Sequence, residues 1–323
     1  MGDEGEVKQV SQGRKRESLR RAFGAIHAHL EDPRIVEIML NPDGQLWVEA
    51  LGGEMETRGR VDPIRALQII ATVAALLDTV VTADRPLLEC ELPLDGSRFE
   101  ALVPPLVLAP AFTIRKKASM IFTLDQYVAA GILSPDHAAV IRTAVGERKN
   151  LLISGGTGTG KTTLANAVLH EVAQSTGSHR IVIIEDTREL QCAASNAVFL
   201  RTSDNVDMTR LLRATMRLRP DRIVVGEVRG GEALALLKAW NTGHPGGVGT
   251  VHANDAPAAL IRLEQLIQES GVPVIPALIA EAVDYVVSIK RSGRGRVVDE
   301  IVRVDGYRAD AGYVLTAIPG AAT

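Results

Sequence analysis

The stretch "NLLISGGTGTGKTTLANAV", residues 150–168, decides the fold of the second half of the chain. An aliphatic segment leads into four glycines within the six positions 155–160, and Lys161 follows at once. Glycine costs roughly 0.5–1 kcal/mol of backbone entropy where a regular element could stand, so this loop must need bare backbone. The segment before the loop predicts a buried strand. After it, apolar residues over 164–172 recur with the spacing of one helix face.

The loop has the spacing of a P-loop, in which Gly155 is followed after four residues by Gly160, Lys161 and Thr162. A loop of this kind turns successive N–H groups toward a phosphate, and the following helix adds its positive N-terminal end. Side chains in the loop would block the phosphates, which explains the glycines. Lys161 can reach the β- and γ-phosphates, and the Thr162 hydroxyl can hold Mg²⁺. The pattern therefore predicts a site for a nucleoside triphosphate.

Composition bounds the class of protein. The 323 residues suffice for two domains, and 46% hydrophobic with 23% charged residues is typical of a folded protein. The net charge of −3 argues against broad electrostatic capture of DNA, and we expect no sequence-specific nucleic-acid binding. Cys90 and Cys192 are too few for a four-cysteine zinc site and fit reduced cytosolic thiols. No apolar run approaches the roughly 20 residues of a membrane span, which predicts a cytoplasmic protein.

The chain is expected to form two domains joined by a linker. We expect disorder over residues 1–13, a small α+β domain over 14–118, a linker over 119–135 and a second domain over 136–323. Within the first domain the patterns predict helices over 17–30 and 63–77, two strands within 35–50 around the turn 41–44, and further strands within 96–105 and 111–117.

In the second domain apolar strands alternate with helices, which predicts βαβ units and a mostly parallel sheet covered on both faces. A helix is expected to start at Ser134, and a hairpin is expected to turn at residues 292–295. The predicted fold class is α/β, with a small α+β domain followed by a P-loop domain. The predicted strands are 150–154, 181–186, 198–202, 222–227 and 247–252.

Acidic residues follow two of these strands, at the edge where α/β sheets bind ligands. Glu185 and Asp186 end one strand, with Glu189 soon after. A carboxylate there can orient a water for attack on the γ-phosphate, although it can also simply end the strand. Gly226 and Glu227 end another strand and resemble a Walker B element in which glycine replaces the usual aspartate.

Two histidines, His244 and His252, bracket a glycine-rich turn and a short strand. A histidine near phosphates can donate a hydrogen bond to the γ-phosphate and act as a sensor. A structural role is the alternative for each. A metal site is not supported, because no third ligand has the spacing of a metal site.

Four segments in this order resemble the secretion and traffic ATPase superfamily, which powers type II and type IV secretion and type IV pili. They are "GGTGTGKTT", "IIEDTREL", "LRPDRIVVGEVRGGEA" and "TGHPGGVGTVHAND". They correspond to that family's Walker A, Asp box, Walker B and His box. The Gly-Glu form of Walker B is the family's own pattern, which explains the missing aspartate. The resemblance is strong from Leu151 to about Asp284.

The first half of the chain is similar to the conjugal transfer ATPases named TrbB, of type IV secretion systems, through "DPRIVEIMLNPDGQLWVE", "DGSRFEALVPP" and "FTIRKK". The tetracysteine insertion of many type II secretion members is lacking. The resemblance implies a RecA-like motor domain after the N-terminal domain, six subunits in a ring, and nucleotide between the two domains. It also implies that Arg98 and Arg115 reach the phosphates. Arg229 could act near the site or only form a salt bridge.

We therefore expect a hexameric Mg²⁺-dependent ATPase, with ATP and Mg²⁺ bound, that is the cytoplasmic motor of a type IV secretion system in conjugal DNA transfer. It is expected to be peripheral to the inner membrane through partners, namely inner-membrane secretion components and coupling ATPases. The alternatives are a type II secretion or type IV pilus motor, a DNA-translocating RecA-like ATPase, and a non-catalytic nucleotide-gated docking scaffold.

The expected site residues fall into four sets. The residues expected to bind nucleotide are Gly156, Thr157, Gly158, Thr159, Gly160, Lys161, Thr162 and Thr163, with Thr163 at the α-phosphate. The expected catalytic residues are Lys161, Glu185, Glu227 and His252, and the choice between Glu185 and Glu227 for positioning the attacking water stays open. The expected phosphate sensors are Arg98, Arg115, Arg229 and His244, and the expected metal ligands are Thr162 and Glu227.

Overall fold

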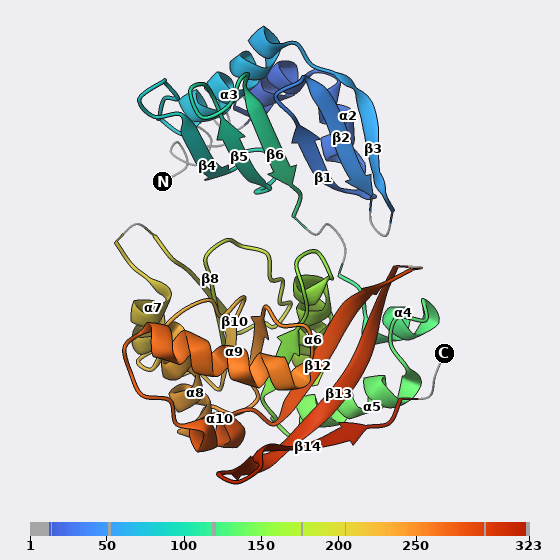
Figure 1. Cartoon of the computed structure of the whole chain (residues 1–323), viewed down its shortest axis with the longest axis vertical. Helices are drawn as coiled ribbons and strands as arrows, with labels where there is room; N and C mark the ends of the chain where they lie inside the picture. Colours follow the sequence, from blue (N-terminus) through green and yellow to red (C-terminus); the bar gives the residue numbers. More distant parts are fainter. Residues whose placement is uncertain are drawn as a thin grey trace. The chain divides into compact units, whose positions relative to one another are not determined.

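A computed structural model describes residues 13, 15–50, 53–117, 121–175, 177–203, 205–293 and 295–320. The chain divides into two compact units, Met1–Met120 and Ile121–Thr323 (Figure 1). Each unit has its own sheet and its own hydrophobic core. The disorder expected for residues 1–13 lies, apart from the helical Gly13, outside the described residues.

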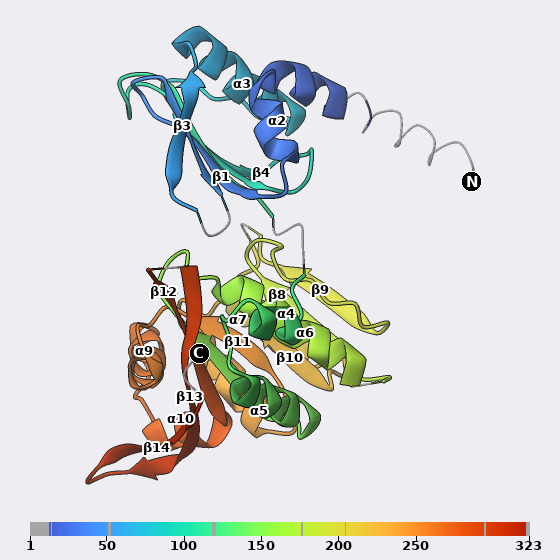
Figure 2. The ribbon, with the colours of Figure 1, turned by 90° about the vertical axis from the view of Figure 1, so that its right-hand side faces the viewer.

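The first unit contains a six-stranded antiparallel sheet in the order β3-β2-β1-β6-β5-β4. Helices α2 (Ile26–Glu31) and α3 (Pro63–Leu76) lie on one face of this sheet (Figure 2). Alternate strand residues such as Ile38, Phe99 and Ile114 join the buried face of α3 in one core. The strands are β1 (Ile35–Leu40), β2 (Gln45–Ala50), β3 (Met55–Arg60), β4 (Leu87–Glu91), β5 (Arg98–Leu102) and β6 (Ala111–Arg115).

Two features of this unit differ from the sequence prediction. The helix expected over 17–30 is interrupted at Gly24, whose φ of +56° is left-handed, so residues 15–23 and α2 are separate helical segments. Strands β3 and β4 were not expected. In β3 all six residues are exposed. The strand therefore has no buried face, and its sequence lacks the apolar alternation from which a strand is predicted.

The second unit contains an eight-stranded sheet in the order β14-β13-β12-β7-β11-β10-β8-β9. Neighbours from β12 to β9 are parallel, whereas β13 and β14 are antiparallel additions at one edge. The predicted α/β class with a mostly parallel sheet is confirmed. The strands are β7 (Leu151–Ser154), β8 (Ile181–Glu185), β9 (Ala197–Arg201), β10 (Arg222–Val225), β11 (Val248–Val251), β12 (Tyr285–Ser292), β13 (Gly295–Arg308) and β14 (Gly312–Ile318).

Helices cover both faces of this sheet, with α9 on one side and α5 and α6 on the other (Figure 2). The central strands β7, β8, β10 and β11 are buried along their whole length, as expected for parallel strands between two helical layers. The helices are α4 (Leu124–Ala129), α5 (Pro135–Gly146), α6 (Lys161–Ser175), α7 (Met208–Thr215), α8 (Glu232–Asn241), α9 (Ala256–Glu269) and α10 (Pro276–Ala282).

The segment expected to be a linker, 119–135, differs from that expectation. Part of it forms α4, which is capped by Thr123 and contacts α5 and α6. Leu124 and Tyr127 of α4 are buried in the core of the second unit, so the segment belongs to that unit's packing. None of the helices in the described part of the chain is both long and apolar enough to cross a membrane.

Candidate nucleotide-binding site

The P-loop connects the end of β7 to the start of α6. Residues 155–160 form the loop, Lys161 is the first residue of α6, and Thr162 and Thr163 lie in its first turn. Strands β8, β10 and β11 run parallel to β7, so the residues that follow them gather at the same edge of the sheet as the loop. This edge carries most of the residues that the sequence singled out.

Most loop positions that hold glycine require it for a second reason, besides leaving room for phosphate. A Cβ on Gly155 would lie 2.4 Å from the carbonyl oxygen of Ile289 in β12. Gly158 and Gly160 have φ values of +69° and +98°, which side chains rarely adopt. Only Gly156 has an ordinary φ and no neighbour closer than 3.7 Å to an added Cβ. Backbone geometry and contact with β12 therefore fix the other three glycines.

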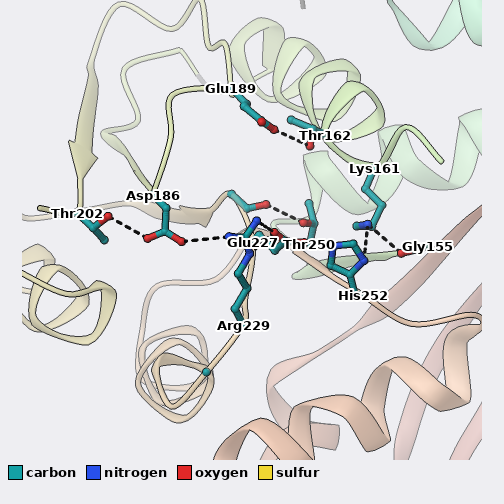
Figure 3. A network of polar contacts seen from close by, with 12 residues as sticks. Gly155, Lys161, Thr162, Asp186, Glu189, Thr202, Glu227, Arg229, Thr250 and His252 are labelled. Atoms are coloured by element: carbon teal, nitrogen blue, oxygen red, sulfur yellow. Dashed lines mark hydrogen bonds and ion pairs between the residues drawn. The ribbon is translucent and has the colours of Figure 1, made fainter. Parts of the chain in front are cut away.

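Lys161 begins a line of polar contacts across the strand ends (Figure 3). Its ammonium donates to the carbonyl oxygens of Gly155 and Gly156 at 2.9 and 3.0 Å and lies 3.3 Å from His252 Nδ1. The His252 Nε2 lies 2.5 Å from a carboxylate oxygen of Glu227. An imidazole with its proton on Nε2 satisfies both contacts, because Nδ1 then accepts from the lysine and Nε2 donates to the glutamate.

The line continues from Glu227 toward β9. Arg229 pairs with the Glu227 carboxylate and lies 3.8 Å from Asp186, which accepts a hydrogen bond from the Thr202 hydroxyl at 3.0 Å (Figure 3). Arg229 is thus tied to two carboxylates. The salt-bridge role considered for Arg229 is present in the structure, and its action as a phosphate sensor stays a prediction. Asp186 and Thr202 were not among the expected site residues.

The two candidate carboxylates for water positioning have different surroundings. Glu185 is only 4% exposed, and one of its oxygens accepts hydrogen bonds from the backbone N–H groups of Glu189 and Leu190, at 3.0 and 2.8 Å. The Glu227 side chain is 16% exposed and lies between His252 and Arg229. Glu185 therefore holds the loop after β8, whereas both oxygens of Glu227 contact charged or ionisable side chains.

Glu189 is the carboxylate that contacts the Thr162 hydroxyl, at 3.2 Å (Figure 3). Asn166 of α6 supports this arrangement, since it donates to the Glu189 carbonyl at 3.2 Å and accepts from the Gln191 N–H at 2.8 Å. The structure gives Thr162 a contact with Glu189, and the expectation that Thr162 and Glu227 are metal ligands stays a prediction. The sequence signal was the third acidic residue in the Asp-box segment.

Gly226 takes the place of the usual Walker B aspartate because Glu185 needs the space. A Cβ on Gly226 would lie 2.8 Å from Glu185 Cγ, closer than two non-bonded carbon atoms approach. The neighbouring Thr250 hydroxyl donates to the Gly226 carbonyl at 2.7 Å and ties β10 to β11. The glycine and the buried glutamate are therefore one packing unit.

His244 is not part of this network. It precedes β11, next to Pro245, whose carbonyl oxygen lies 3.5 Å from Arg148, and to the turn in which Gly247 donates to Asn150 at 2.9 Å. Those contacts are at the amino ends of β7 and β11, and a strand of four residues separates them from the P-loop edge by about 13 Å. The expectation that His244 senses phosphate at this edge is corrected by this placement.

Arg98 and Arg115 lie in the first unit, directly opposite each other in β5 and β6. Glu91 of β4 is the register partner of Arg98 on one side, and Glu37 of β1 is the register partner of Arg115 on the other. Cross-strand partners project from the same face of a sheet, so two arginines stand side by side in a row flanked by glutamates. Their expected role as phosphate sensors stays a prediction.

Comparison with known proteins agrees with these motifs. The family model described as "Type II/IV secretion system protein" matches residues 21–294. Conjugal transfer protein TrbB of Rhizobium radiobacter is 54% identical over 279 residues, which are 86% of this chain and 86% of the relative. The probable conjugal transfer protein TrbB of Sinorhizobium fredii is 55% identical over 278 residues, with 86% of each chain covered.

A solved structure shows the same fold. The ATPase DotB of Yersinia pseudotuberculosis superimposes with a TM-score of 0.61 at 15% identity, covering 88% of this chain and 78% of that one. At this identity the likeness concerns the fold alone. The family match and the identity to the TrbB proteins confirm the resemblance seen in the motifs, and the chain belongs to the type II/IV secretion system protein family of secretion ATPases.

Proposed function

We propose that this protein is a Mg²⁺-dependent ATPase that converts ATP and water to ADP and phosphate, and that it acts as a hexameric motor of a type IV secretion system in conjugal DNA transfer. The observation that carries the catalytic part is the line Lys161–His252–Glu227 at the P-loop edge. It joins a phosphate-binding cation, an imidazole and a carboxylate within hydrogen-bond reach. The relatives named for conjugal transfer support the biological part.

In this proposal Lys161 binds the β- and γ-phosphates in place of its present contacts with Gly155, Gly156 and His252. The loop N–H groups and the N-terminus of α6 supply the remaining positive potential, and Thr163 contacts the α-phosphate. Once Lys161 turns to phosphate, His252 loses the donor at its Nδ1. An imidazole that carries a proton on both ring nitrogens can then donate from Nδ1 to the γ-phosphate while its Nε2 donates to Glu227.

Glu227 is the carboxylate that we assign to the attacking water. Its two oxygens contact His252 and Arg229, and its side chain is 16% exposed, whereas Glu185 is enclosed. A carboxylate in such a place can accept a proton from water as the water approaches phosphorus. Glu185 receives the different role of positioning Glu189, because its oxygen is held by two backbone N–H groups.

The residues present fit Mg²⁺. This ion prefers oxygen ligands and is usually bound through one or two protein groups together with substrate phosphates and waters. The Thr162 hydroxyl and the Glu189 carboxylate, 3.2 Å apart, offer such oxygens at the start of α6. We assign Thr162 as the ligand and Glu189 as its partner. A bound Mg²⁺ would neutralise charge that develops on the phosphates.

The remaining parts of the proposal concern assembly. Arg98 and Arg115 would bind the γ-phosphate through two adjacent guanidinium groups, a geometry that suits phosphate oxygens.

We propose a location on the cytoplasmic side of the inner membrane, reached through secretion components and coupling ATPases. A pilus or type II secretion motor is the alternative with the same chemistry. Loss of pilus motility rather than of plasmid transfer would identify a pilus motor.

The test of catalysis is phosphate release by the purified chain with ATP and Mg²⁺, compared with Lys161→Ala. We expect turnover in the native protein and none above background in the variant, because the variant lacks the phosphate-binding cation. Removal of Mg²⁺ by a chelator should stop turnover as well. A native protein that binds ATP and releases no phosphate, alone or with membranes, would instead support a nucleotide-gated docking scaffold.

A further inference from the structure

The hairpin formed by β12 and β13 lies against the P-loop, and nothing in the proposed mechanism uses it. Arg291 of β12 and Arg296 of β13 are register partners near its tip, so their side chains project from the same face. Arg291 Nη2 lies 2.7 Å from the position of a Cβ on Gly158. Arg296 Cδ lies 3.1 Å from the position of a Cβ on Gly160. Two guanidinium side chains therefore fill the space beside these glycines.

One of these contacts orients the loop backbone. Arg296 Nη2 donates to the carbonyl oxygen of Gly158 at 3.3 Å. Because a trans peptide is planar, a carbonyl held toward the hairpin turns the next N–H group, that of Thr159, to the opposite side. The Thr159 side chain adds to this order by donating to the Gly156 carbonyl at 2.9 Å.

The hairpin also brings charge to the loop. Arginine is charged at every pH at which the protein is folded, and an exposed loop of N–H groups is a site for anions. Arg291 and Arg296 thus join Lys161 as cations in contact with the same few residues, Gly155 to Gly160. The strand order places β12 beside β7, although the two arginines follow the P-loop by more than a hundred residues.

We propose that Arg291 and Arg296 are positioning residues of the nucleotide site. They hold the P-loop with the Gly158 carbonyl toward the hairpin, and they raise the positive potential around the bound polyphosphate, so that affinity increases with the number of phosphates. This inference rests on the proposed ATP-binding function. It gives the antiparallel hairpin at the edge of the sheet a part in nucleotide binding.

The chain offers a matched control. Lys290 precedes Arg291 in β12 and projects to the opposite face of the strand, where its ammonium pairs with Asp299 at 2.6 Å. Lys290→Ala removes one cation from the same strand without touching the P-loop. Arg296→Lys keeps the charge while removing the guanidinium group.

The experiment measures the dissociation constants of ATP and ADP by calorimetric titration of the full chain, at low and high salt. The proteins are the native chain, Arg291→Ala, Arg296→Ala, Arg296→Lys and Lys290→Ala, each checked for native melting. We expect each arginine-to-alanine change to weaken ATP binding about tenfold, the size of a charge-assisted hydrogen bond. The loss should be larger for ATP than for ADP and should shrink at high salt. Arg296→Lys should recover part of it.

Three results would contradict the role of the hairpin, the effect of its charge, or ATP binding itself. If both alanine variants bind ATP as Lys290→Ala does, the hairpin has no part in nucleotide binding. If they lose affinity equally for ATP and ADP at every salt concentration, the effect of charge is excluded and the arginines only support packing. If the native chain binds no ATP, the proposed function fails, and that result is distinct from the other two.

Discussion

At the scale of single residues, the site separates two carboxylates that the sequence could not tell apart. Both Glu185 and Glu227 end a buried strand at the same edge. Glu185 is enclosed and accepts two backbone hydrogen bonds, whereas Glu227 shares its oxygens with an imidazole and a guanidinium. The difference lies in the loop geometry after β8 and β10, which no spacing rule describes.

Glu227→Gln tests this assignment. The amide keeps the shape of the side chain but cannot accept a proton from water, so we expect turnover to fall by about 10²–10⁴-fold while ATP still binds. Phosphate release and ATP titration on the same sample measure the two properties. Glu269→Gln, an exposed change in α9, is the control and should leave both properties as in the native protein. Normal turnover in Glu227→Gln would show that the water is positioned elsewhere.

Gly226 gives a second prediction at this scale. Replacing it by alanine places a Cβ 2.8 Å from Glu185 Cγ, and we expect a loss of about 1–3 kcal/mol in the free energy of unfolding from this overpacking. Gly226→Asp, which would restore the common Walker B sequence, should be worse, because it adds a charge beside a buried carboxylate. Denaturant unfolding and phosphate release measure the effects. An aspartate variant as stable and active as the native chain would contradict the packing seen here.

The strand-end rule predicted part of the site and missed part of it. Lys161, Glu227 and His252 come together because parallel strands end at one edge, which the alternating pattern in the sequence implies. Glu189 was noticed but given no partner, since its contact with Thr162 depends on the fold of the loop after β8. Arg291 and Arg296 were missed, because the sequence does not reveal that β12 pairs with β7.

At the scale of elements, the fold was predictable where an element has a buried face. Strands β7 to β11 and helix α3 lie within a few residues of their predicted ranges, and α5 starts where its start was predicted. Among these, the edge strand β9 has no buried residue, and its run of apolar residues sufficed for the prediction. Strand β3 (Met55–Arg60) was missed because all its residues are exposed. Strand β14 was missed because it is an edge strand with no buried residue along its length. Exposed edges leave little apolar periodicity to detect.

The contact between the P-loop and β12 predicts unequal effects for two adjacent glycines. Gly155→Ala would push a Cβ into the backbone oxygen of Ile289, which cannot move aside as a side chain can. We expect this change to cost about 1–3 kcal/mol in the free energy of unfolding. Gly156→Ala meets only the Thr159 methyl group, at 3.7 Å, and should cost less than about 0.5 kcal/mol. Urea unfolding compares the pair, and equal losses would contradict the contact.

At the scale of the whole molecule, the central prediction is assembly. A ring motor needs six copies, so we expect a mass six times that of the 34.6 kDa chain with Mg²⁺ and a non-hydrolysable ATP analogue. Light scattering after size-exclusion chromatography measures it, with the Lys161→Ala variant as the control for nucleotide dependence. A monomer or dimer at micromolar concentration would leave the nucleotide site in place and remove the support for a ring.

The packing of the P-loop against the β12–β13 hairpin also bears on inheritance. The two segments are far apart in the gene, so recombination between related genes can join the loop of one parent to the hairpin of the other. The tightest contact of Gly155 with β12 is with the backbone oxygen of Ile289, which any residue at that position supplies. The contacts of Arg291 and Arg296 depend on their side chains. Viable mosaic genes should therefore encode both arginines, whichever parent supplies the P-loop.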